Sequence, residues 1–393
     1  MALRFPMQTP STPSPGNSQA MPHEDNQHNG FDTDYARILE RTEQIDPVRY
    51  AKTRNYTDGA VTRLSPYISR GVISTRMILD RILEMDLPFS SIEKFIQELA
   101  WRDYWQQIWL AKGEAINGDL KHRQQDVLHD RMPIALVNAS TGIEAIDNAI
   151  RQLYQTGYMH NHMRMYVASV ACNIGKSHWR IPALWMYYHL LDGDWASNAL
   201  SWQWVAGSNA NKKYLANQEN INRYFHSEQK QTFLDCSYEE LATMQVPAIL
   251  QQTCAPSRTT DLPSGQAIEL QPGLPTLVYN YYNLDPEWRK EQDANRILLL
   301  EPSVFRQYPV APKNIAFILR LAKNIPGIQL CCAEFDALQQ LAPDETIIFK
   351  EHPLNRHYRG HEDPRDWMFG VEGYFPSFFK FWKHCKKEID SPG

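Results

Sequence analysis

The chain has 393 residues, of which 43% are hydrophobic and 11% aromatic. This apolar content is ample for a large core, and the length fits two domains better than one. The formal net charge of -5 gives no global signature of a nucleic-acid binder, but a local basic groove is compatible with an acidic whole, so charge neither supports nor excludes DNA.

The six cysteines are scattered along the chain without a CxxC pair. Their spacing argues against a zinc ribbon and against a secreted disulfide framework, and it predicts reduced thiols. The histidines from His352 to His361 lack a firm metal spacing, so we expect no metal site. The amino terminus has no apolar signal-peptide core, and no run of about 18 apolar residues suggests a membrane span. A cytoplasmic protein without membrane contact is therefore expected.

The first part of the chain divides into three stretches. Residues 1–30 are rich in Pro, Ser, Gln, Asn and His, so they cannot bury enough surface to offset chain entropy and are predicted to be a disordered tail. Residues 31–230 have a helical pattern, in which Ile146, Ile150 and Leu153 recur at three- and four-residue steps. Residues 231–275 have scattered prolines and little periodicity, which predicts a linker.

Residues 276–393 alternate apolar runs of strand length with one helical stretch, Asn314 to Asn324. The runs of strand length are Thr276 to Tyr282, Arg296 to Leu300, Ile328 to Cys332 and Thr346 to Phe349. This alternation predicts a small α/β unit. The aromatic and basic segment GVEGYFPSFFKFWKHCKK near the end is predicted to be an amphipathic helix that packs on a neighbour. The expected fold class is therefore mainly α, with a small α/β unit at the carboxy terminus.

Specific motifs follow one another in the helical region. They are VTRLSPYISRGVIS from Val61, FIQELAWRDYWQQIW from Phe95, TGIEAIDNAIRQLYQTGYMHN from Thr141, and the stretch from Tyr158 to Gly207. In this order they resemble the flavin-binding helical domain of the photolyase/cryptochrome family, over roughly residues 47–207. The resemblance implies FAD as the cofactor and assigns residues 31–230 to this domain.

The family's α/β antenna domain normally precedes the helical domain, and its signature strand is missing from the front of this chain. We therefore expect a short photolyase-like protein, for which an antenna pigment is doubtful. The strands of residues 276–393 resemble the middle of that antenna domain, so a displaced partial copy and convergence are both open. The scattered cysteines predict no iron-sulfur cluster.

The resemblance also assigns the residues that would bind FAD. Arg63, Leu64 and Ser65 open a helix, whose unpaired backbone N–H groups favour a diphosphate. Asp192 would pair with Arg164 against the isoalloxazine ring. The complete predicted set is Tyr50, Thr62, Arg63, Leu64, Ser65, Trp101, Asn161, Arg164, Asp192, Asp194 and Asn198.

Three side chains match the family's redox positions. Asn198 matches the residue that faces flavin N5, and Asn rather than Asp there favours repair. Trp202 and Trp179 match the first and second members of the tryptophan chain that reduces the photoexcited flavin. The third tryptophan is absent, because Asn138-Ala139-Ser140 stands at its place, and Trp195 and Trp109 are the alternatives.

A second set of residues would hold a DNA lesion that has been flipped out of the helix. Without the resemblance, Glu98 and Trp101 would be a half-buried helix face with a satisfied carboxylate. With it, they line the lesion pocket, and the indole offers a stacking surface. His162 replaces an arginine that contacts phosphate in relatives, which predicts weaker or pH-dependent DNA binding. The predicted substrate set is Glu98, Trp101, Asn161, His162, Met165 and Trp204.

These assignments lead to one expected function and one alternative. The expected enzyme is a photolyase-like lyase in which electron transfer from reduced FAD, driven by blue light, splits cyclobutane pyrimidine dimers in single- or double-stranded DNA. Its predicted catalytic residues are Glu98, Asn198, Trp202 and Trp179. The alternative is a cryptochrome-like photoreceptor without repair, which the missing third tryptophan and His162 favour.

Overall fold

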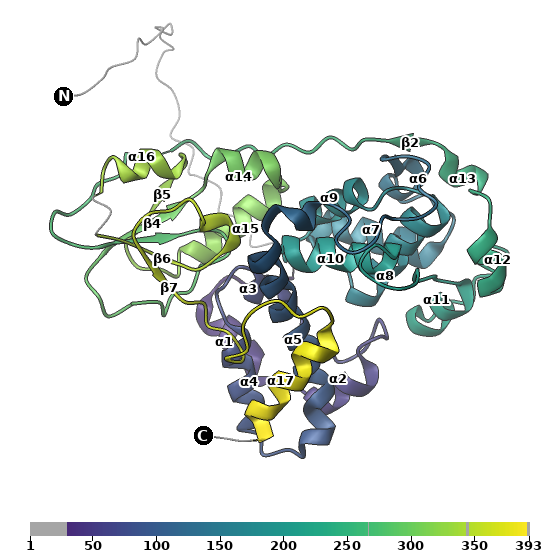
Figure 1. Cartoon of the computed structure of the whole chain (residues 1–393), viewed down its shortest axis with the longest axis horizontal. Helices are drawn as coiled ribbons and strands as arrows, with labels where there is room; N and C mark the ends of the chain where they lie inside the picture. The colour runs from purple at the N-terminus through teal and green to yellow at the C-terminus, as the bar shows by residue number, and fades with distance from the viewer. Residues whose placement is uncertain (1–29, 266, 343–345, 391–393) are drawn as a thin grey trace, which may run out of the picture.

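The computed structural model describes residues 30–390 except 266 and 343–345, so the predicted tail lies almost entirely outside the described residues. Figure 1 shows helices gathered in one part of the molecule and a sheet with its own helices beside them. Among the described residues, none of the helices combines the length and apolar character needed to cross a bilayer.

The residues predicted as helical contain helices α1 to α11. These helices begin at capping side chains in several places, since Asp34, Asp46, Ser74 and Asn217 each accept a hydrogen bond from a backbone N–H in the first turn. The helices up to residue 137 are α1 (Tyr35–Glu43), α2 (Pro47–Thr53), α3 (Ser65–Ser69), α4 (Thr75–Leu83), α5 (Phe89–Lys112), a 3₁₀ helix (Gly113–Asn117) and α6 (Ile134–Val137). The following ones are α7 (Glu144–Thr156), α8 (Asn161–Ser169), a π-helical turn (Val170–Ile174), α9 (Arg180–His189), α10 (Trp195–Ala206) and α11 (Gln218–Phe225).

Helix α7 shows how the apolar spacing translates into structure. Ile146, Ile150 and Leu153 are fully buried, as their three- and four-residue steps predict. The helix ends where Gly157 adopts a left-handed conformation with φ +75°. Local patterning alone is therefore enough to define this helix and its buried face.

The described residues of the carboxy-terminal region form a five-stranded sheet whose neighbouring strands are all parallel, in the order β5-β4-β3-β6-β7. The strands are β3 (Thr276–Tyr279), β4 (Asn295–Leu299), β5 (Ile328–Cys331), β6 (Ile347–Lys350) and β7 (His361–Asp363). Its helices are α14 (Pro302–Gln307), α15 (Pro312–Ala322), α16 (Phe335–Gln339) and a 3₁₀ turn (Pro353–Asn355). The predicted α/β unit is confirmed, while β7 was missed because its exposed residues carry no apolar run.

The end of the chain departs from the predicted boundaries. The segment predicted as an amphipathic helix is α17 (Phe378–Asp390), and it packs along α5 of the helical region rather than on the sheet (Figure 1). Trp382 Nε1 donates a hydrogen bond to Glu93 of α5 at 3.3 Å. Among the described residues, α17 thus belongs with the helical region rather than with the sheet, because it packs on α5.

The predicted linker also has more structure than its prolines indicate. It contains α12 (Tyr238–Thr243), α13 (Ala248–Gln251) and β2 (Thr253–Cys254). Strand β2 pairs antiparallel with β1 (Met132–Pro133) of the helical region. The segment therefore runs along the helical region before it enters the sheet.

The sheet meets the helical region at the carboxyl ends of β3 and β6. Tyr282, after β3, stacks on His352, after β6, with ring centroids 4.4 Å apart, and Trp109 of α5 lies 5.2 Å from the His352 ring. A Cβ atom at Gly71 would lie 2.4 Å from the Tyr282 carbonyl oxygen, so this contact requires glycine. The crevice where open α/β sheets commonly bind ligands is thus occupied by the helical region.

Candidate functional site

The helical region encloses a cavity of about 770 Å³. This volume lies within the range of roughly 300–1,000 Å³ that is usual for ligand pockets. All the predicted site residues are described, and every one except Trp179 lines the cavity. The predicted residues in the lining are Tyr50, Thr62, Arg63, Leu64, Ser65, Glu98, Trp101, Asn161, His162, Arg164, Met165, Asp192, Asp194, Asn198, Trp202 and Trp204.

A buried ion pair lies in the cavity wall. Arg164 Nη2 lies 3.1 and 3.0 Å from the two carboxylate oxygens of Asp192, and Arg164 Nε donates to the Met159 carbonyl at 2.9 Å. Burial opposes ionisation of Asp192, but Arg164 and a hydrogen bond from Ser65 outweigh it and hold the pKa of Asp192 below its usual value. The pairing of these two residues, inferred from the resemblance, is present in the structure.

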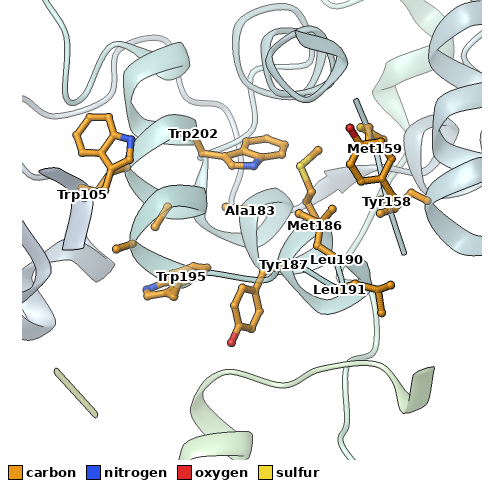
Figure 2. Packing of buried hydrophobic residues seen from close by; sticks show 14 of the residues in the cluster. Trp105, Tyr158, Met159, Ala183, Met186, Tyr187, Leu190, Leu191, Trp195 and Trp202 are labelled. Carbon is orange, nitrogen blue, oxygen red and sulfur yellow. The ribbon is translucent and has the colours of Figure 1, made fainter. Parts of the chain in front are cut away.

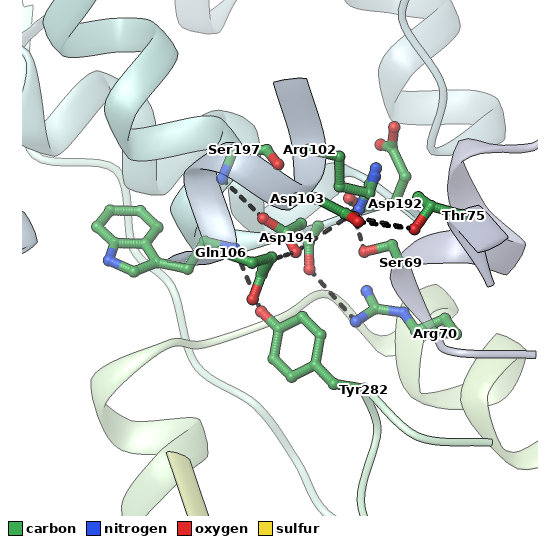
Figure 3. Close-up of polar contacts among 12 residues, drawn as sticks. Ser69, Arg70, Thr75, Arg102, Asp103, Gln106, Asp192, Asp194, Ser197 and Tyr282 are labelled. Atoms are coloured by element: carbon green, nitrogen blue, oxygen red, sulfur yellow. Dashed lines mark hydrogen bonds and ion pairs between the residues drawn. The ribbon is translucent and has the colours of Figure 1, made fainter. Parts of the chain in front are cut away.

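Asp194 is held by a hydrogen-bond network that sequence reasoning missed. One carboxylate oxygen accepts from the Ser197 backbone N–H at 2.7 Å and so caps α10. The other accepts from Gln106 Nε2 and lies 3.6 Å from Arg102 Nη1 (Figure 3). Arg365, which follows β7, donates to Gln106 Oε1 at 2.7 Å. The i, i+4 spacing of Arg102 and Gln106 on the helix that carries Glu98 could have indicated from the sequence that both residues face the site. No sequence pattern connects Arg365 with them.

The loop that carries both aspartates is fixed from the side of α3. Arg70 donates to the carbonyl oxygens of Leu191 at 3.1 Å and Gly193 at 3.3 Å, and Ser69 Oγ donates to the Asp192 carbonyl at 3.1 Å (Figure 3). Arg70 is fully buried, and its guanidinium also lies 5.4 Å from the ring centre of Tyr281. The α/β unit therefore contacts the residue that holds the cavity loop in place.

The predicted phosphate-binding segment begins a helix, as expected. Helix α3 starts at Ser65, and its N-cap Leu64 provides no side-chain cap. Arg63 has φ +54°, in the left-handed region that non-glycine residues rarely adopt. Strain of this kind persists only where the surroundings impose it, and it concentrates at binding sites.

The lesion-binding residues have partners that the sequence did not reveal. Glu98 Oε1 lies 2.9 Å from Lys94 Nζ and 3.3 Å from Arg54 Nε, so its charge is compensated. Trp101 stacks on Phe378 of α17, with ring centroids 3.9 Å apart and an interplanar angle of 10°. Phe378 therefore covers one face of the indole that was predicted to stack on a base.

The role predicted for His162 needs a correction. Its side chain is 7% exposed and packs between the rings of Tyr166 and Tyr224, at 4.6 and 4.7 Å. Its Nδ1 is 3.1 Å from the Asn55 carbonyl oxygen. Burial lowers the pKa of His162, which keeps the ring neutral. A buried, neutral imidazole is not placed to contact a DNA phosphate.

Of the two predicted electron-transfer tryptophans, one lines the cavity and the other does not. Trp202 of α10 lines the cavity, and Figure 2 shows it above Trp195 on the same helix. Trp179, immediately before α9, is fully buried and is not among the residues that line the cavity. Its ring centroid lies 6.4 Å from that of Trp195. Trp109, the other predicted alternative, is near Tyr308 at 6.0 Å.

The chemistry of the lining fits a flavin dinucleotide. Arg63 supplies positive charge for phosphates, and the backbone N–H groups at the start of α3 supply donors. Ser197 Oγ is buried at the lining without a hydrogen-bond partner among the described residues. Asn198 Nδ2 donates to the Ala183 carbonyl at 2.8 Å, which orients its amide. In the described part of the chain, His, Cys, Asp and Glu side chains form no group of three or more that could hold a metal ion.

Comparison with known proteins agrees with this geometry. Residues 95–278 match the family model described as the FAD binding domain of DNA photolyase. The deoxyribodipyrimidine photo-lyase of Alkalihalophilus pseudofirmus is 33% identical over 148 residues, which are 37% of this chain and 31% of the relative. That of Streptomyces griseus is 35% identical over 162 residues, which are 39% of this chain and 35% of the relative. The chain thus spans about a third of the length of these curated relatives.

Among solved structures, the Synechocystis sp. PCC6803 cryptochrome has a TM-score of 0.44 and 23% identity, covering 52% of this chain and 46% of its own. A bacterial class III photolyase from Agrobacterium tumefaciens has a TM-score of 0.43 and 25% identity, covering 48% of this chain and 42% of its own. The range of the family match contains most of the residues that line the cavity. Residues 95–278 of this chain are therefore similar to the FAD binding domain of DNA photolyase.

Proposed function

We propose that the chain binds FAD in the cavity and uses it for light-driven splitting of cyclobutane pyrimidine dimers in DNA. The observation that carries the proposal is a single cavity lined by the Asp192–Arg164 pair, by Asn198, and by Glu98 with Trp101. The names of the curated relatives, deoxyribodipyrimidine photo-lyase, support it. Bound FAD in its fully reduced form would supply the electron that splits the dimer under blue light.

The protein's part at the cofactor end is to bind and orient. Arg63 would hold the diphosphate by its charge, and the backbone N–H of Ser65 would donate a hydrogen bond to it. The Asp192–Arg164 pair would lie beside the isoalloxazine ring as a fixed pair of charges. Because Asn198 already donates to Ala183, its amide oxygen would be directed to the ring nitrogen N5 as an acceptor.

At the other end, the protein would hold the flipped dimer. Trp101 offers one indole face for stacking, because Phe378 covers the other. Trp204 is 38% exposed and Met165 lies in the same lining, so both are placed for apolar contact with the bases. Glu98, held by Lys94 and Arg54, would accept hydrogen bonds from the base edges.

A cryptochrome-like photoreceptor without repair is the second candidate. The burial of His162 favours it, because the side chain cannot supply the phosphate contact that an exposed cation would. Both functions need bound flavin, so flavin binding does not separate them. The two candidates differ in whether light restores thymines in damaged DNA.

The test is blue-light repair of a thymine-dimer oligonucleotide, single- and double-stranded, by purified protein with chemically reduced flavin. Wild type should restore the thymines only under illumination. Trp101→Ala and Glu98→Ala should still bind FAD, while repair falls by roughly tenfold or more through loss of a stacking contact or a hydrogen bond. No repair by wild type with flavin fully bound and reduced would support the photoreceptor, and equal repair by these variants would reject the assigned lesion pocket.

A further inference from the structure

The indole N–H of Trp179 donates its hydrogen bond to a carboxylate, although an uncharged acceptor would be sufficient for a buried indole. Trp179 Nε1 donates to Asp119 Oδ1 at 2.9 Å, and the tryptophan side chain is fully buried. A neutral acceptor such as a backbone carbonyl would satisfy the same donor. An ionised acceptor at this distance additionally favours positive charge on the ring.

The carboxylate is held in place by Gln124, which also holds Trp179. The Gln124 backbone N–H donates to Asp119 Oδ2 at 2.9 Å, and Gln124 Oε1 accepts from the Trp179 backbone N–H at 2.9 Å. Gln124 is 4% exposed and donates to the Ser177 carbonyl at 2.8 Å. Trp179 and the Asp119 carboxylate are thus fixed relative to each other through one buried residue, Gln124.

Asp119 also connects this pair to solvent. Its side chain is 19% exposed, and its Oδ1 lies 3.4 Å from Nε2 of His178, whose side chain is 27% exposed. A proton that reaches Asp119 can therefore leave through water or through the imidazole. Trp179 itself has no exposed surface, so Asp119 is its route for a proton.

We propose that Asp119 accepts the indole proton of Trp179 when this tryptophan is oxidised, which makes Trp179 the terminal electron donor in place of the missing surface tryptophan. The inference rests on the proposed function. When FAD is bound in its oxidised form, it would supply the light-driven electron acceptor for Trp202, and Trp179 would then replace the electron that Trp202 has lost. The Nε1–H bond of Trp179 breaks and an O–H bond forms on Asp119 Oδ1. The neutral Trp179 radical is later reduced by one electron from a thiol in solution, and it regains a proton.

Proton loss explains how charge separation could last without an outer tryptophan. Oxidation makes the indole positively charged and its N–H strongly acidic, and the adjacent carboxylate stabilises both the charge and the transferred proton. Once neutral, Trp179 can take its electron back only by recovering the proton. The step therefore slows the return of the electron.

Trp195 is the competing destination, because its ring lies 6.4 Å from that of Trp179. Its Nε1 donates to Asn117 Oδ1 at 2.7 Å. An amide oxygen accepts a hydrogen bond but does not take up a proton near neutral pH. Oxidised Trp195 would therefore keep its proton and its charge in a buried site, which costs free energy. Because Asp119 can take up a proton and Asn117 cannot, the radical is expected to remain on Trp179 rather than on Trp195.

Transient absorption of the full-length protein with oxidised flavin, after a blue-light pulse in H₂O and in D₂O, tests the proposal. Wild type should form a neutral tryptophan radical, more slowly in D₂O. Asp119→Asn keeps a hydrogen-bond acceptor but cannot take the proton. This variant should show the tryptophan radical cation without an isotope effect. The radical cation should last about one tenth as long as the neutral radical of wild type, a factor that corresponds to one pKa unit of interaction energy. Trp195→Phe is the matched control and should behave like wild type.

The outcomes separate this inference from the proposed function. Purified protein without flavin absorption would reject FAD binding itself. If flavin is bound but D119N still forms the neutral radical with an isotope effect, only the role of Asp119 is rejected. Loss of the long-lived radical in W195F would instead place the vacancy on Trp195 and overturn the proposal. Should D119N fail to fold, an absent isotope effect in wild type alone would overturn it.

Discussion

Replacing Asp192 with Asn tests the buried ion pair at the centre of the site. Asp192 is 5% exposed and accepts hydrogen bonds from Arg164 at 3.1 and 3.0 Å. Breaking a fully buried pair costs about 3–5 kcal/mol, because the remaining charge is stranded away from water. The Arg164 side chain is 20% exposed, so water solvates it in part. We therefore expect D192N to lower the free energy of unfolding by about 2–3 kcal/mol.

Urea unfolding of the FAD-free protein at pH 7 measures this change by linear extrapolation. FAD is removed because a ligand adds stability that would differ between variants. Glu40→Gln is the matched control, since Glu40 pairs with Arg37 at the surface and the two side chains are 55% and 65% exposed. Exposed pairs contribute about 0–1 kcal/mol, so the control should stay within that range.

The pH dependence provides an independent check. Arg164 and the hydrogen bond from Ser65 hold the folded-state pKa of Asp192 below its usual value despite burial. The stabilisation is therefore present above the unfolded pKa of about 3.9 and is lost as pH falls through the folded pKa. The gap between wild type and D192N should shrink in acid. Equal stability of the two proteins at pH 7, or a gap that widens on acidification, would refute the argument.

Two further predictions concern residues outside the expected set or with a changed role. Arg365→Gln removes the charged donor that holds Gln106 against Asp194. The Kd for FAD should therefore rise by about tenfold or more in a fluorescence titration of the apoprotein. Arg359→Gln, at an exposed position, is the control, and equal affinities of the two variants for FAD would contradict a role of this network in FAD binding. Burial lowers the pKa of His162, so its ring should titrate below the usual value of about 6.5 in an NMR titration. A midpoint at or above that value would restore His162 as a pH-dependent phosphate contact.

Much of the site follows from spacing within single segments. Asn161, Arg164 and Met165 lie at i, i+3 and i+4, and all line the cavity because helical geometry places such residues on one face. The apolar runs of residues 276–350 became parallel strands at nearly the predicted positions. Such features depend on the pitch of a helix or the alternation of a strand, which the order of residues determines directly.

Contacts between distant segments were decided by the tertiary structure. Three contacts join residues that are far apart in the sequence: the hydrogen bond from Arg365 to Gln106, the stacking of Phe378 on Trp101, and the hydrogen bond from Trp179 to Asp119. Their separations along the chain follow no helical or strand period. Spacing does not encode these pairs, because they depend on how whole helices and the sheet pack against one another. The burial of His162 has the same origin, since the rings around it come from separate segments. The sequence by itself thus determined which side chains of each helix line the cavity. The tertiary packing determined which distant residues hydrogen-bond to them, cover them or compensate their charge.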